Sequence, residues 1–531
     1  MEIFLSFILC TLLVAGVSWY KTRATNLQTV KGLFLADKRN GYLIVASSLI
    51  LTNLSANQFI GENESVYINN MSVMAWGVTS VIAMLLVSEF VLPIYFRGGM
   101  ITTPDFLANR YDAGTKRLVS IVFLISYMAN LLPPVLYGGA VALTGMFHLP
   151  DLWGFSYGQS VWLMVWVLGL IGSAYTILGG LRAITISDTL LGAGLLLLAI
   201  VLPFYALQYL GDGSFLMGLK LLLASHTEHL NAIGSVNDAV PFSTIFTGML
   251  LVNLYYWGVE QYIVQQTLAA KSLKDAQKGM ALAALAKLIM PVLINLPGLI
   301  AVHLYSHTDY TASIFPLLAA DTLPPILLGI TTALVFGAAI TTYNAGLHGS
   351  STLFVMNLYL PHMKKSGKNV TEAKLVAVGR RFELLLSILA MFTAPLILFA
   401  DSGFYTYLQR VAGLFSLPIF TIIVVGFFTK KVPPIAAKIG LLFFMLAYFT
   451  CEYVFQLQLH YLHVLALLFL LTVALMLIIG LCFPSKHHPL PLRAHLEDPC
   501  QPWKSRHLAA VVLVAFMLAV YILFSPWGVA S

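Results

Sequence analysis

The chain has 531 residues, of which 59% are hydrophobic and only 10% charged, against about 25% charged in an ordinary soluble domain. These charged side chains are too few to cover a water-facing globule of this size, so the composition indicates a membrane protein with many spans. A nucleic-acid-binding role is excluded, although the net charge is +7, because the basic residues are scattered in short loops. The four cysteines lack metal-type spacing and a dense disulfide pattern, so they do not organise the fold.

A bilayer core requires about 20 apolar residues per helix, and fourteen such stretches are predicted. The sequence therefore indicates an all-α polytopic membrane protein. The first stretch has Glu2 but no Lys or Arg ahead of it, while Lys21 and Arg23 follow it, which is typical of an uncleaved anchor with its N-terminus outside. The predicted spans lie near 2–20, 42–60, 71–96, 118–146, 160–179, 187–208, 243–262, 280–304, 326–356, 381–400, 407–429, 434–455, 461–483 and 508–525.

Loop charge predicts the orientation of these spans. If the N-terminus is outside, all but three of the 29 Lys and Arg residues fall in inner loops. The exceptions are Lys220 in an outer loop and Lys287 and Arg410 within spans. Because positive residues are enriched on the cytoplasmic side, this alternation predicts both termini outside.

Two spans interrupted by polar residues, about 200 residues apart, each open a group of five spans. This spacing is the pattern of an inverted-repeat transporter. The expected organisation is an anchor helix with an inner loop (1–41), a first five-helix repeat (42–208), an outer loop (209–242), a second five-helix repeat (243–429) and three further C-terminal helices (430–531).

The second span carries an unusual density of polar side chains. Thr52, Asn53, Ser55, Asn57 and Gln58 fall within seven residues. Hydrogen bonding between helices explains such residues in one interpretation. In the other, the helix is discontinuous and its unwound carbonyls bind a cation.

Polar residues also interrupt the seventh span, which reads Asn253-Leu-Tyr-Tyr-Trp-Gly and then Glu260. The ninth span contains Thr341 and Thr342. Their hydroxyls suit sodium, which prefers hard oxygen donors, but threonines in membrane helices also bond back to the preceding turn. Lys287 lies about two turns into the eighth span, where it either faces the bundle interior or snorkels to the cytoplasm.

Several motifs together resemble the sodium/solute symporter family, specifically its bacterial sodium/galactose cotransporter branch. The most specific is the seventh-span motif followed by Gln265-Gln-Thr-Leu-Ala-Ala-Lys-Ser and Ala276-Gln-Lys-Gly. Pro104-Asp-Phe-Leu-Ala-Asn-Arg-Tyr and Leu178-Gly-Gly-Leu-Arg-Ala-Ile-Thr-Ile-Ser-Asp also match. The resemblance runs from the first span to about the thirteenth, and it implies a broken-helix sodium symporter fold with a 5+5 inverted-repeat core.

The resemblance implies a sodium site between the second and ninth spans. Its ligands are the carbonyls of Leu51, Leu54 and Ala338 and the hydroxyls of Thr341 and Thr342. The family has Ser where this chain has Thr, which keeps both hydroxyls. Asp188 matches an acid that helps sodium leave towards the cytoplasm, although on residue type alone it is equally an interfacial helix cap.

The resemblance also implies a sugar site and an inner gate. Tyr256 matches the aromatic residue that covers the sugar from the inside, with Trp257 beside it. The polar contacts to sugar carried over are Asn53, Gln58, Ser80, Asn253, Lys287 and Gln409.

Two positions depart from the family pattern. A Glu that contacts sugar in the galactose transporter aligns with Gly77, and an apolar residue near the outer gate aligns with Glu62, with Glu64 two positions on. Losing one buried acceptor and gaining acids nearby changes which hydroxyls are recognised, because unpaired buried polar groups discriminate strongly. Galactose itself is therefore in doubt.

The expected function is sodium-coupled import of a small solute, a hexose or related sugar, by alternating access. Sodium is the expected co-transported ion, and the protein is expected to be embedded in the lipid bilayer. Neither nucleic acid nor an obligate protein partner is expected. The expected location is the bacterial inner membrane. The alternatives are sodium symport of a carboxylate, amino acid or other small organic solute, and, outside transport, a membrane sensor or an intramembrane enzyme. The sequence lacks an HExxH or GxSxG motif, so no catalytic residue is predicted.

Overall fold

The computed structural model describes residues 1–22, 40–54, 56–100, 102–306, 308, 310–399, 404–485 and 501–531. Within these ranges the side chains of 22, 51, 177–185, 188 and 404–406 are not described, so the predicted role of the Asp188 side chain lies outside the described residues. The regular structure of the described ranges is helical, and the one bridge found there joins Asn40 to Ala270. The predicted all-α architecture is confirmed.

The helices of the first half of the chain are α1 (Glu2–Thr22), α3 (Tyr42–Asn53), α4 (Ala56–Ile68), α5 (Ala75–Val78), α6 (Ser80–Leu86), α7 (Leu92–Gly98), α8 (Thr103–Arg110), α9 (Ala113–Ser126), α10 (Leu132–Met146), α11 (Leu149–Trp153), α12 (Tyr157–Leu210) and α13 (Phe215–Ala224). Those of the second half are α14 (Gly248–Gly258), α15 (Gln261–Leu268), α16 (Leu273–Leu304), α17 (Ile314–Thr322), α18 (Pro325–Leu353), α19 (Leu360–Lys365), α20 (Glu372–Thr393), α21 (Phe404–Phe428), α22 (Pro434–Phe449), α23 (Tyr461–Cys482) and α24 (Arg506–Leu523).

Twelve helical segments of the described ranges are long and apolar enough to cross a membrane. The two remaining predicted spans, 42–60 and 243–262, are each built from two shorter helices, α3 with α4 and α14 with α15. Neither half of these pairs reaches span length alone. Twelve continuous segments and two broken ones account for the fourteen predicted spans.

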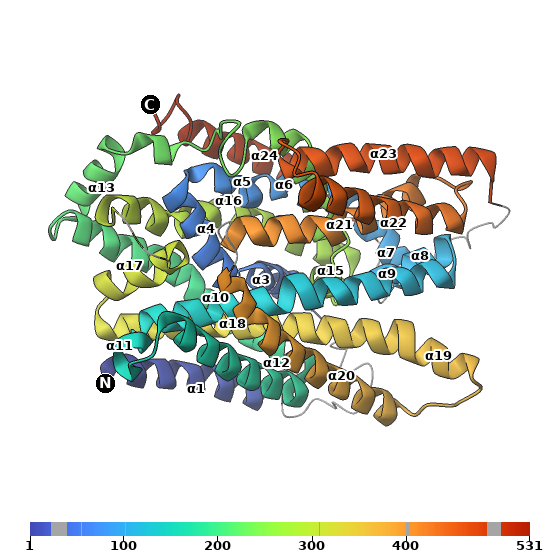
Figure 1. Ribbon diagram of the computed structural model, residues 1–531, viewed down its shortest axis with the longest axis horizontal. Helices are drawn as coiled ribbons and strands as arrows, with labels where there is room; N and C mark the ends of the chain where they lie inside the picture. Colours follow the sequence, from blue (N-terminus) through green and yellow to red (C-terminus); the bar gives the residue numbers. More distant parts are fainter. Residues whose placement is uncertain are drawn as a thin grey trace.

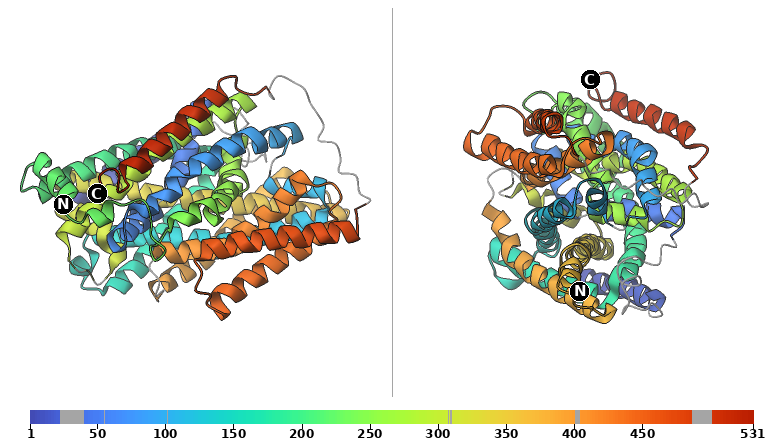
Figure 2. Two further views of the ribbon diagram at one scale, coloured as in Figure 1. Left: turned by 90° about the horizontal axis from the view of Figure 1, so that it is seen from above. Right: turned by 90° about the vertical axis from the view of Figure 1, so that its right-hand side faces the viewer.

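The element α12 has 54 residues, which is enough for two spans. Two span-length segments lie within it, Tyr157–Thr176 and Thr189–Leu210. The helices before and after it, α11 and α13, lie at the same end of the molecule (Figures 1 and 2). The two segments therefore run in opposite directions, as two predicted spans joined by an inner turn require.

Short π-helical segments interrupt several spans, and prolines explain three of them. The segments η3 (Val87–Val91), η4 (Tyr127–Leu131) and η8 (Phe354–Tyr359) each end two residues before a proline, namely Pro93, Pro133 and Pro361. Proline has no N–H for the carbonyl four residues earlier, and its ring crowds that turn, so the preceding turn widens instead of staying α-helical.

The described apolar residues form two large clusters. One is built mainly from α6, α14, α16 and α21 to α24, and the other mainly from α4, α10, α12, α18 and α20. The broken helix joins them, since Val45 and Leu49 of α3 belong to the first and Phe59 and Ile60 of α4 to the second. Helix α18 packs against α1, α10, α12 and both halves of this broken helix, so it borders the point where the two clusters meet.

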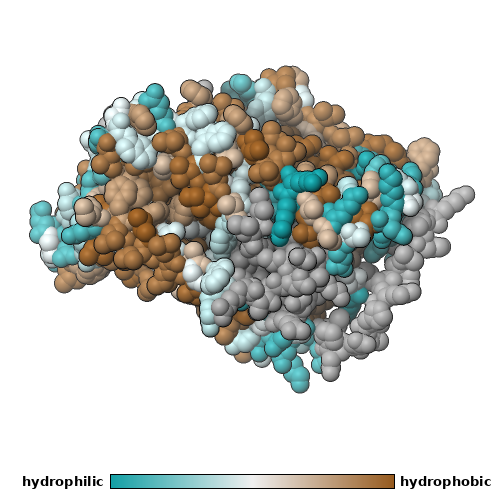
Figure 3. Space-filling view, turned by 90° about the horizontal axis from the view of Figure 1, so that it is seen from below, coloured by the Kyte–Doolittle hydropathy of each residue, from teal (hydrophilic) through white to brown (hydrophobic). Residues whose placement is uncertain are grey.

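Both termini lie at the same end of the molecule, with α13, while α8 and α19 lie at the other (Figures 1 and 2). Figure 3 shows an apolar surface across the middle of the molecule, with hydrophilic residues towards the two ends. Exposed side chains such as Leu163, Leu197 and Leu470 form part of the apolar surface of the molecule. This arrangement fits a chain that crosses a membrane an even number of times.

Candidate functional site

A cavity of about 210 Å³ lies beside the break in each of the two interrupted helices. Further walls come from η4 and α21, and Thr342 of α18 completes the lining. The polar side chains that line it are Thr52, Asn53, Asn57, Gln58, Ser126, Tyr127, Asn130, Tyr255, Tyr256, Glu260, Tyr262, Thr342, Gln409 and Ser416.

The first break is a local change of the backbone at the end of α3. Leu54 has φ −73° and ψ 84°, outside the helical region, although its N–H still donates to the carbonyl of Ile50 at 2.8 Å. Helix α4 restarts at Ala56. Peptide groups at such a break lack the usual partners of a continuous helix, so they are available to a bound ion or solute. The discontinuous-helix interpretation of the second span is confirmed.

The amides beside this break leave their oxygens without protein partners. The Asn53 Nδ2 donates to the Tyr256 hydroxyl at 2.9 Å, and the Gln58 Nε2 donates to the Glu62 carboxylate at 3.0 Å. The side-chain oxygens of Asn53, Gln58, Asn57 and Asn130 have no hydrogen-bond partner. A buried acceptor left unpaired costs about 1–3 kcal/mol, so the lining suits a ligand that brings hydrogen-bond donors.

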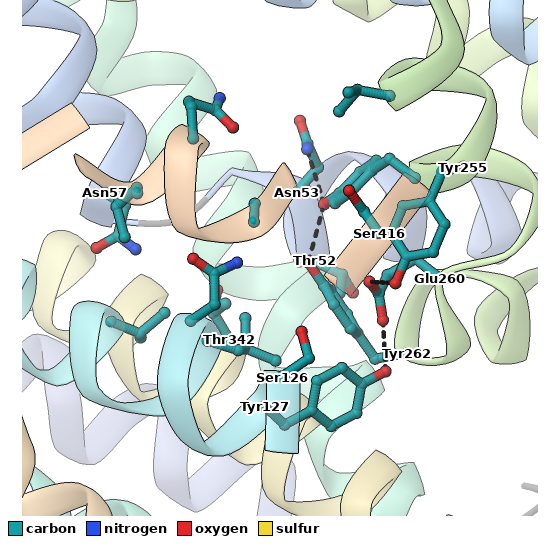
Figure 4. A pocket seen from close by; sticks show the side chains of 18 of the residues that line it. Thr52, Asn53, Asn57, Ser126, Tyr127, Tyr255, Glu260, Tyr262, Thr342 and Ser416 are labelled. Atoms are coloured by element: carbon teal, nitrogen blue, oxygen red, sulfur yellow. Dashed lines mark hydrogen bonds between the residues drawn. The ribbon is translucent and has the colours of Figure 1, made fainter. Parts of the chain in front are cut away.

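A second network surrounds the break between α14 and α15. Glu260 lies in this break and is buried; its carboxylate accepts hydrogen bonds from Tyr127 at 2.5 Å and from Tyr255 at 2.7 Å. The Tyr262 hydroxyl donates to that of Tyr256 at 3.3 Å. Figure 4 shows Glu260 between Tyr127 and Tyr255, with Asn53 on the far side of the same cluster. The two breaks are thus joined through Tyr256 and its hydrogen bond to Asn53.

The residues predicted to bind sodium lie at the two expected places. Leu51 is in the last turn of α3 and Leu54 is its C-terminal cap. On α18 the Thr341 hydroxyl donates to the Ala338 carbonyl at 3.2 Å, whereas the Thr342 hydroxyl is buried without a partner. Helix α18 packs against both α3 and α4. Hydroxyl and carbonyl oxygens of this kind fit the hard-donor preference of sodium.

The residues predicted to bind sugar fall into two groups. Asn53, Gln58 and Gln409 line the cavity, and so does the predicted gate residue Tyr256. The others do not line it. Ser80 donates to the carbonyl of Gly77 at 2.6 Å, and Asn253 donates to the hydroxyl of Thr79 at 3.4 Å. Lys287 is buried within α16. Trp257 is buried, and its ring is nearly perpendicular to that of Tyr256.

The structure gives a packing reason for the departure at Gly77. A Cβ atom there would lie 2.2 Å from the Cγ of Pro291 in α16, so a larger residue requires the two helices to separate. The second departure, Glu62, interacts electrostatically with Lys287, one turn before Pro291. Gly77 and Glu62 thus both face α16, Gly77 at Pro291 and Glu62 through its electrostatic interaction with Lys287.

Sequence reasoning missed one wall of the cavity. Ser126, Tyr127 and Asn130 come from the junction of α9, η4 and α10, and no role is predicted for them. The pair Pro133-Pro134 was the available signal, because consecutive prolines within a span displace the preceding turn and re-aim its side chains. Tyr262 and Ser416 also line the cavity without having been predicted.

Comparison with known proteins gives the family. The sodium:solute symporter family matches residues 33–443. The chain is 38% identical to an uncharacterized symporter, YidK, of Escherichia coli K12 over 99% of this chain and 91% of that protein. It is 30% identical to the sodium/glucose cotransporter of Vibrio parahaemolyticus over 78% of both chains, and 27% identical to the human sodium/myo-inositol cotransporter 2 over 82% of this chain and 67% of that one.

Solved structures agree on the fold. A substrate-bound, outward-open sodium-coupled sialic acid symporter superposes with a TM-score of 0.77 at 16% identity, covering 92% of this chain and 99% of that one. A closed form of the nucleobase–cation symporter Mhp1 gives 0.56 at 14% identity, covering 88% and 97%. This chain belongs to the sodium:solute symporter family. It is a multi-pass membrane transporter that couples solute movement to sodium, and not an enzyme.

Proposed function

We propose that this symporter imports a neutral, polyhydroxylated solute, a hexose or related sugar, together with sodium. The observation that carries the proposal is the set of unpartnered amide oxygens of Asn53, Asn57, Gln58 and Asn130 at one cavity. Each sugar hydroxyl brings a donor, so a sugar satisfies several of these oxygens at once. The tyrosines of the same lining offer the flat apolar faces that pack against a sugar ring.

The charge of the lining favours a neutral solute over an anion. Among the described residues that line the cavity there is no Lys, Arg or His, and Glu260 adds a carboxylate. A carboxylate solute therefore finds no cation there, because the buried Lys287 does not line the cavity and interacts electrostatically with Glu62. Binding an unpaired charge in a buried site is costly.

Names of relatives support both the main proposal and its alternative. One curated relative is a sodium/glucose cotransporter and others are sodium/myo-inositol cotransporters, which fits a polyhydroxylated solute. The alternative is sodium symport of a carboxylate, amino acid or other small organic solute, since one structural neighbour is a sialic acid symporter. The cation-free lining favours the first.

For sodium we propose the carbonyls of Leu51, Leu54 and Ala338 with the hydroxyls of Thr341 and Thr342. The support is the unpartnered hydroxyl of Thr342 and the 3.2 Å separation between the Thr341 hydroxyl and the Ala338 carbonyl. Two of the proposed ligands are thus already neighbours, and a third lacks any other partner. Asp188 is proposed to help sodium leave towards the cytoplasm.

The proposed cycle consists of coupled binding and a change of access. Sodium bound between the break of α3/α4 and α18 stabilises the state that binds sugar, and both ligands favour the state that closes over them. Tyr256, proposed as the inner gate with Trp257 beside it, then releases its hydrogen bond to Asn53 and opens the cavity inward. An inside-negative potential supplies about 2.3 kcal/mol per charge per 100 mV. The membrane is proposed to be the bacterial inner membrane, with both termini outside.

The test is uptake of labelled solutes into proteoliposomes with an inward sodium gradient, compared with potassium. The panel contains several hexoses, an inositol, a sialic acid and an amino acid. Sodium-dependent accumulation of a neutral sugar or polyol is expected. Sodium-driven uptake of only the acid or the amino acid would overturn the substrate proposal and retain the sodium site.

A further inference from the structure

The Gln58 side chain is held in one orientation by a residue outside the cavity. Its Nε2 donates to the Oε1 of Glu62, one turn further along α4, at 3.0 Å. An ionised carboxylate is only an acceptor, so Gln58 must turn its NH₂ group towards Glu62. The carbonyl oxygen of Gln58 is then left without a protein partner beside the cavity.

The charge of Glu62 has its own support. Glu62 is buried, with 1% of its surface exposed, and does not line the cavity. Lys287 of the neighbouring helix α16 is buried as well and interacts with it electrostatically. A positive charge near a buried carboxylate favours its ionised form, so Lys287 supports the charge of Glu62 from the α16 side.

The second oriented amide of the lining is fixed less firmly. Asn53 donates to the Tyr256 hydroxyl, but a phenol hydroxyl both donates and accepts. The Asn53 amide can therefore reverse and keep a hydrogen bond, whereas Gln58 cannot reverse while Glu62 is ionised. The orientation of Gln58 is the more strongly determined of the two.

We infer that Glu62 is a positioning residue which, through its hydrogen bond with Gln58, fixes the Gln58 amide so that the cavity offers only an acceptor at this point. The substrate must then present a hydroxyl that donates to Gln58. This inference rests on the proposed function and deepens it, because it specifies the hydrogen-bonding sense of one substrate hydroxyl. It assigns Glu62 to substrate selection without direct contact.

The experiment uses the full chain in proteoliposomes and the neutral solute that the wild type accumulates. Each hydroxyl of that solute is replaced in turn by hydrogen or by fluorine, and inhibition of sodium-driven uptake is measured. Fluorine retains a weak acceptor but no donor. In the wild type, one position is expected at which the deoxy and fluoro analogues both bind about tenfold more weakly than the parent, as loss of a buried hydrogen bond predicts.

Glu62→Gln frees the Gln58 amide to rotate and donate. At that one position the fluoro analogue is then expected to bind several-fold better than the deoxy analogue. The matched control is Glu64→Gln, because Glu64 is a buried acid of the same helix whose carboxylate accepts from the hydroxyl of Thr311 at 2.6 Å and not from Gln58. The control is expected to keep the wild-type pattern.

The double variant Gln58→Glu/Glu62→Gln moves the carboxylate to the cavity side and is expected to restore equal binding of the two analogues. If the Glu62→Gln variant does not insert into the membrane, the double variant alone tests the inference. Tighter binding of the fluoro analogue than of the deoxy analogue by the double variant overturns the inference. An unchanged pattern in an active Glu62→Gln transporter also overturns it while leaving the proposed function intact. A wild type that accumulates no neutral solute overturns the proposed function first and, with it, the acceptor role of Gln58.

Discussion

Adjacent residues on α18 take different roles because their hydroxyls meet different surroundings. Thr341 bonds to the Ala338 carbonyl of the preceding turn, which is one of the two behaviours expected of threonine in a membrane helix. Thr342 lines the cavity, and its hydroxyl has no partner. A hydroxyl kept unpaired in a buried position points to a ligand, so Thr342 carries more of the sodium proposal than its neighbour.

Thr342→Ala is therefore expected to raise the sodium concentration for half-maximal uptake by about tenfold, the effect of losing one buried oxygen ligand. Thr332→Ala is the control, because Thr332 is buried on the same helix and donates to the Leu328 carbonyl at 2.7 Å, one turn of helix earlier. The measurement is the sodium dependence of solute uptake in proteoliposomes. Equal sodium affinity in Thr342→Ala and the wild type would remove Thr342 from the site.

Glu260 shows how a buried charge is accommodated at a helix break. Tyr127→Phe removes one of its two phenol donors, and hydrogen bonds to charged groups contribute about 1.5–3 kcal/mol, against about 1 kcal/mol for neutral ones. Tyr95→Phe is the control, because the Tyr95 hydroxyl donates to the neutral carbonyl of Gly258 in the same region at 2.9 Å. The midpoint of thermal unfolding in detergent is expected to fall further for Tyr127→Phe. A smaller fall than in the control would contradict the charged network.

At the scale of elements, polar side chains at 52–58 and 253–261 mark the two spans that are broken, although such residues are also explained by hydrogen bonds between helices. The sequence does not predict which side chains line the cavity. Ser80, Asn253 and Lys287 lie on suitable helices, yet none of them lines the cavity. Which side chains reach the lining depends on contacts between distant segments, such as Gly77 with Pro291, which local sequence does not encode.

The contact between Gly77 and Pro291 sets the approach of the third span to α16. Gly77→Ala places a Cβ atom 2.2 Å from the Pro291 ring, and overpacking of this kind costs about 1–3 kcal/mol. Gly16→Ala is the control, because nothing lies within 4 Å of its Cβ position in α1. Thermal unfolding in detergent is expected at a lower temperature for Gly77→Ala and unchanged or higher for Gly16→Ala. Equal unfolding temperatures would show that α16 moves aside at little cost.

For the whole molecule, the number of spans follows from hydropathy alone, because an apolar segment of span length has no other stable location. The broken helices do not disturb this prediction, since their two halves together still cross the membrane. The two termini share one end of the molecule (Figures 1 and 2), which an even number of spans requires. The distribution of charge predicts which end faces the cytoplasm.

The distribution of charge also predicts on which side of the membrane each end of the molecule lies. Lys220 in α13 and Lys368 between α19 and α20 are both exposed, and the positive-inside rule assigns them to opposite sides, outer and inner. In a chain whose four native cysteines have been replaced, Lys220→Cys is expected to react in intact cells with a membrane-impermeant thiol reagent. Lys368→Cys is expected to react only after the membrane is opened, and each variant is the control for the other. Labelling of Lys368→Cys alone in intact cells would reverse the topology. The C-terminal ends of α8 and α19 would then lie outside, and sodium would leave the site on the side from which it is proposed to enter.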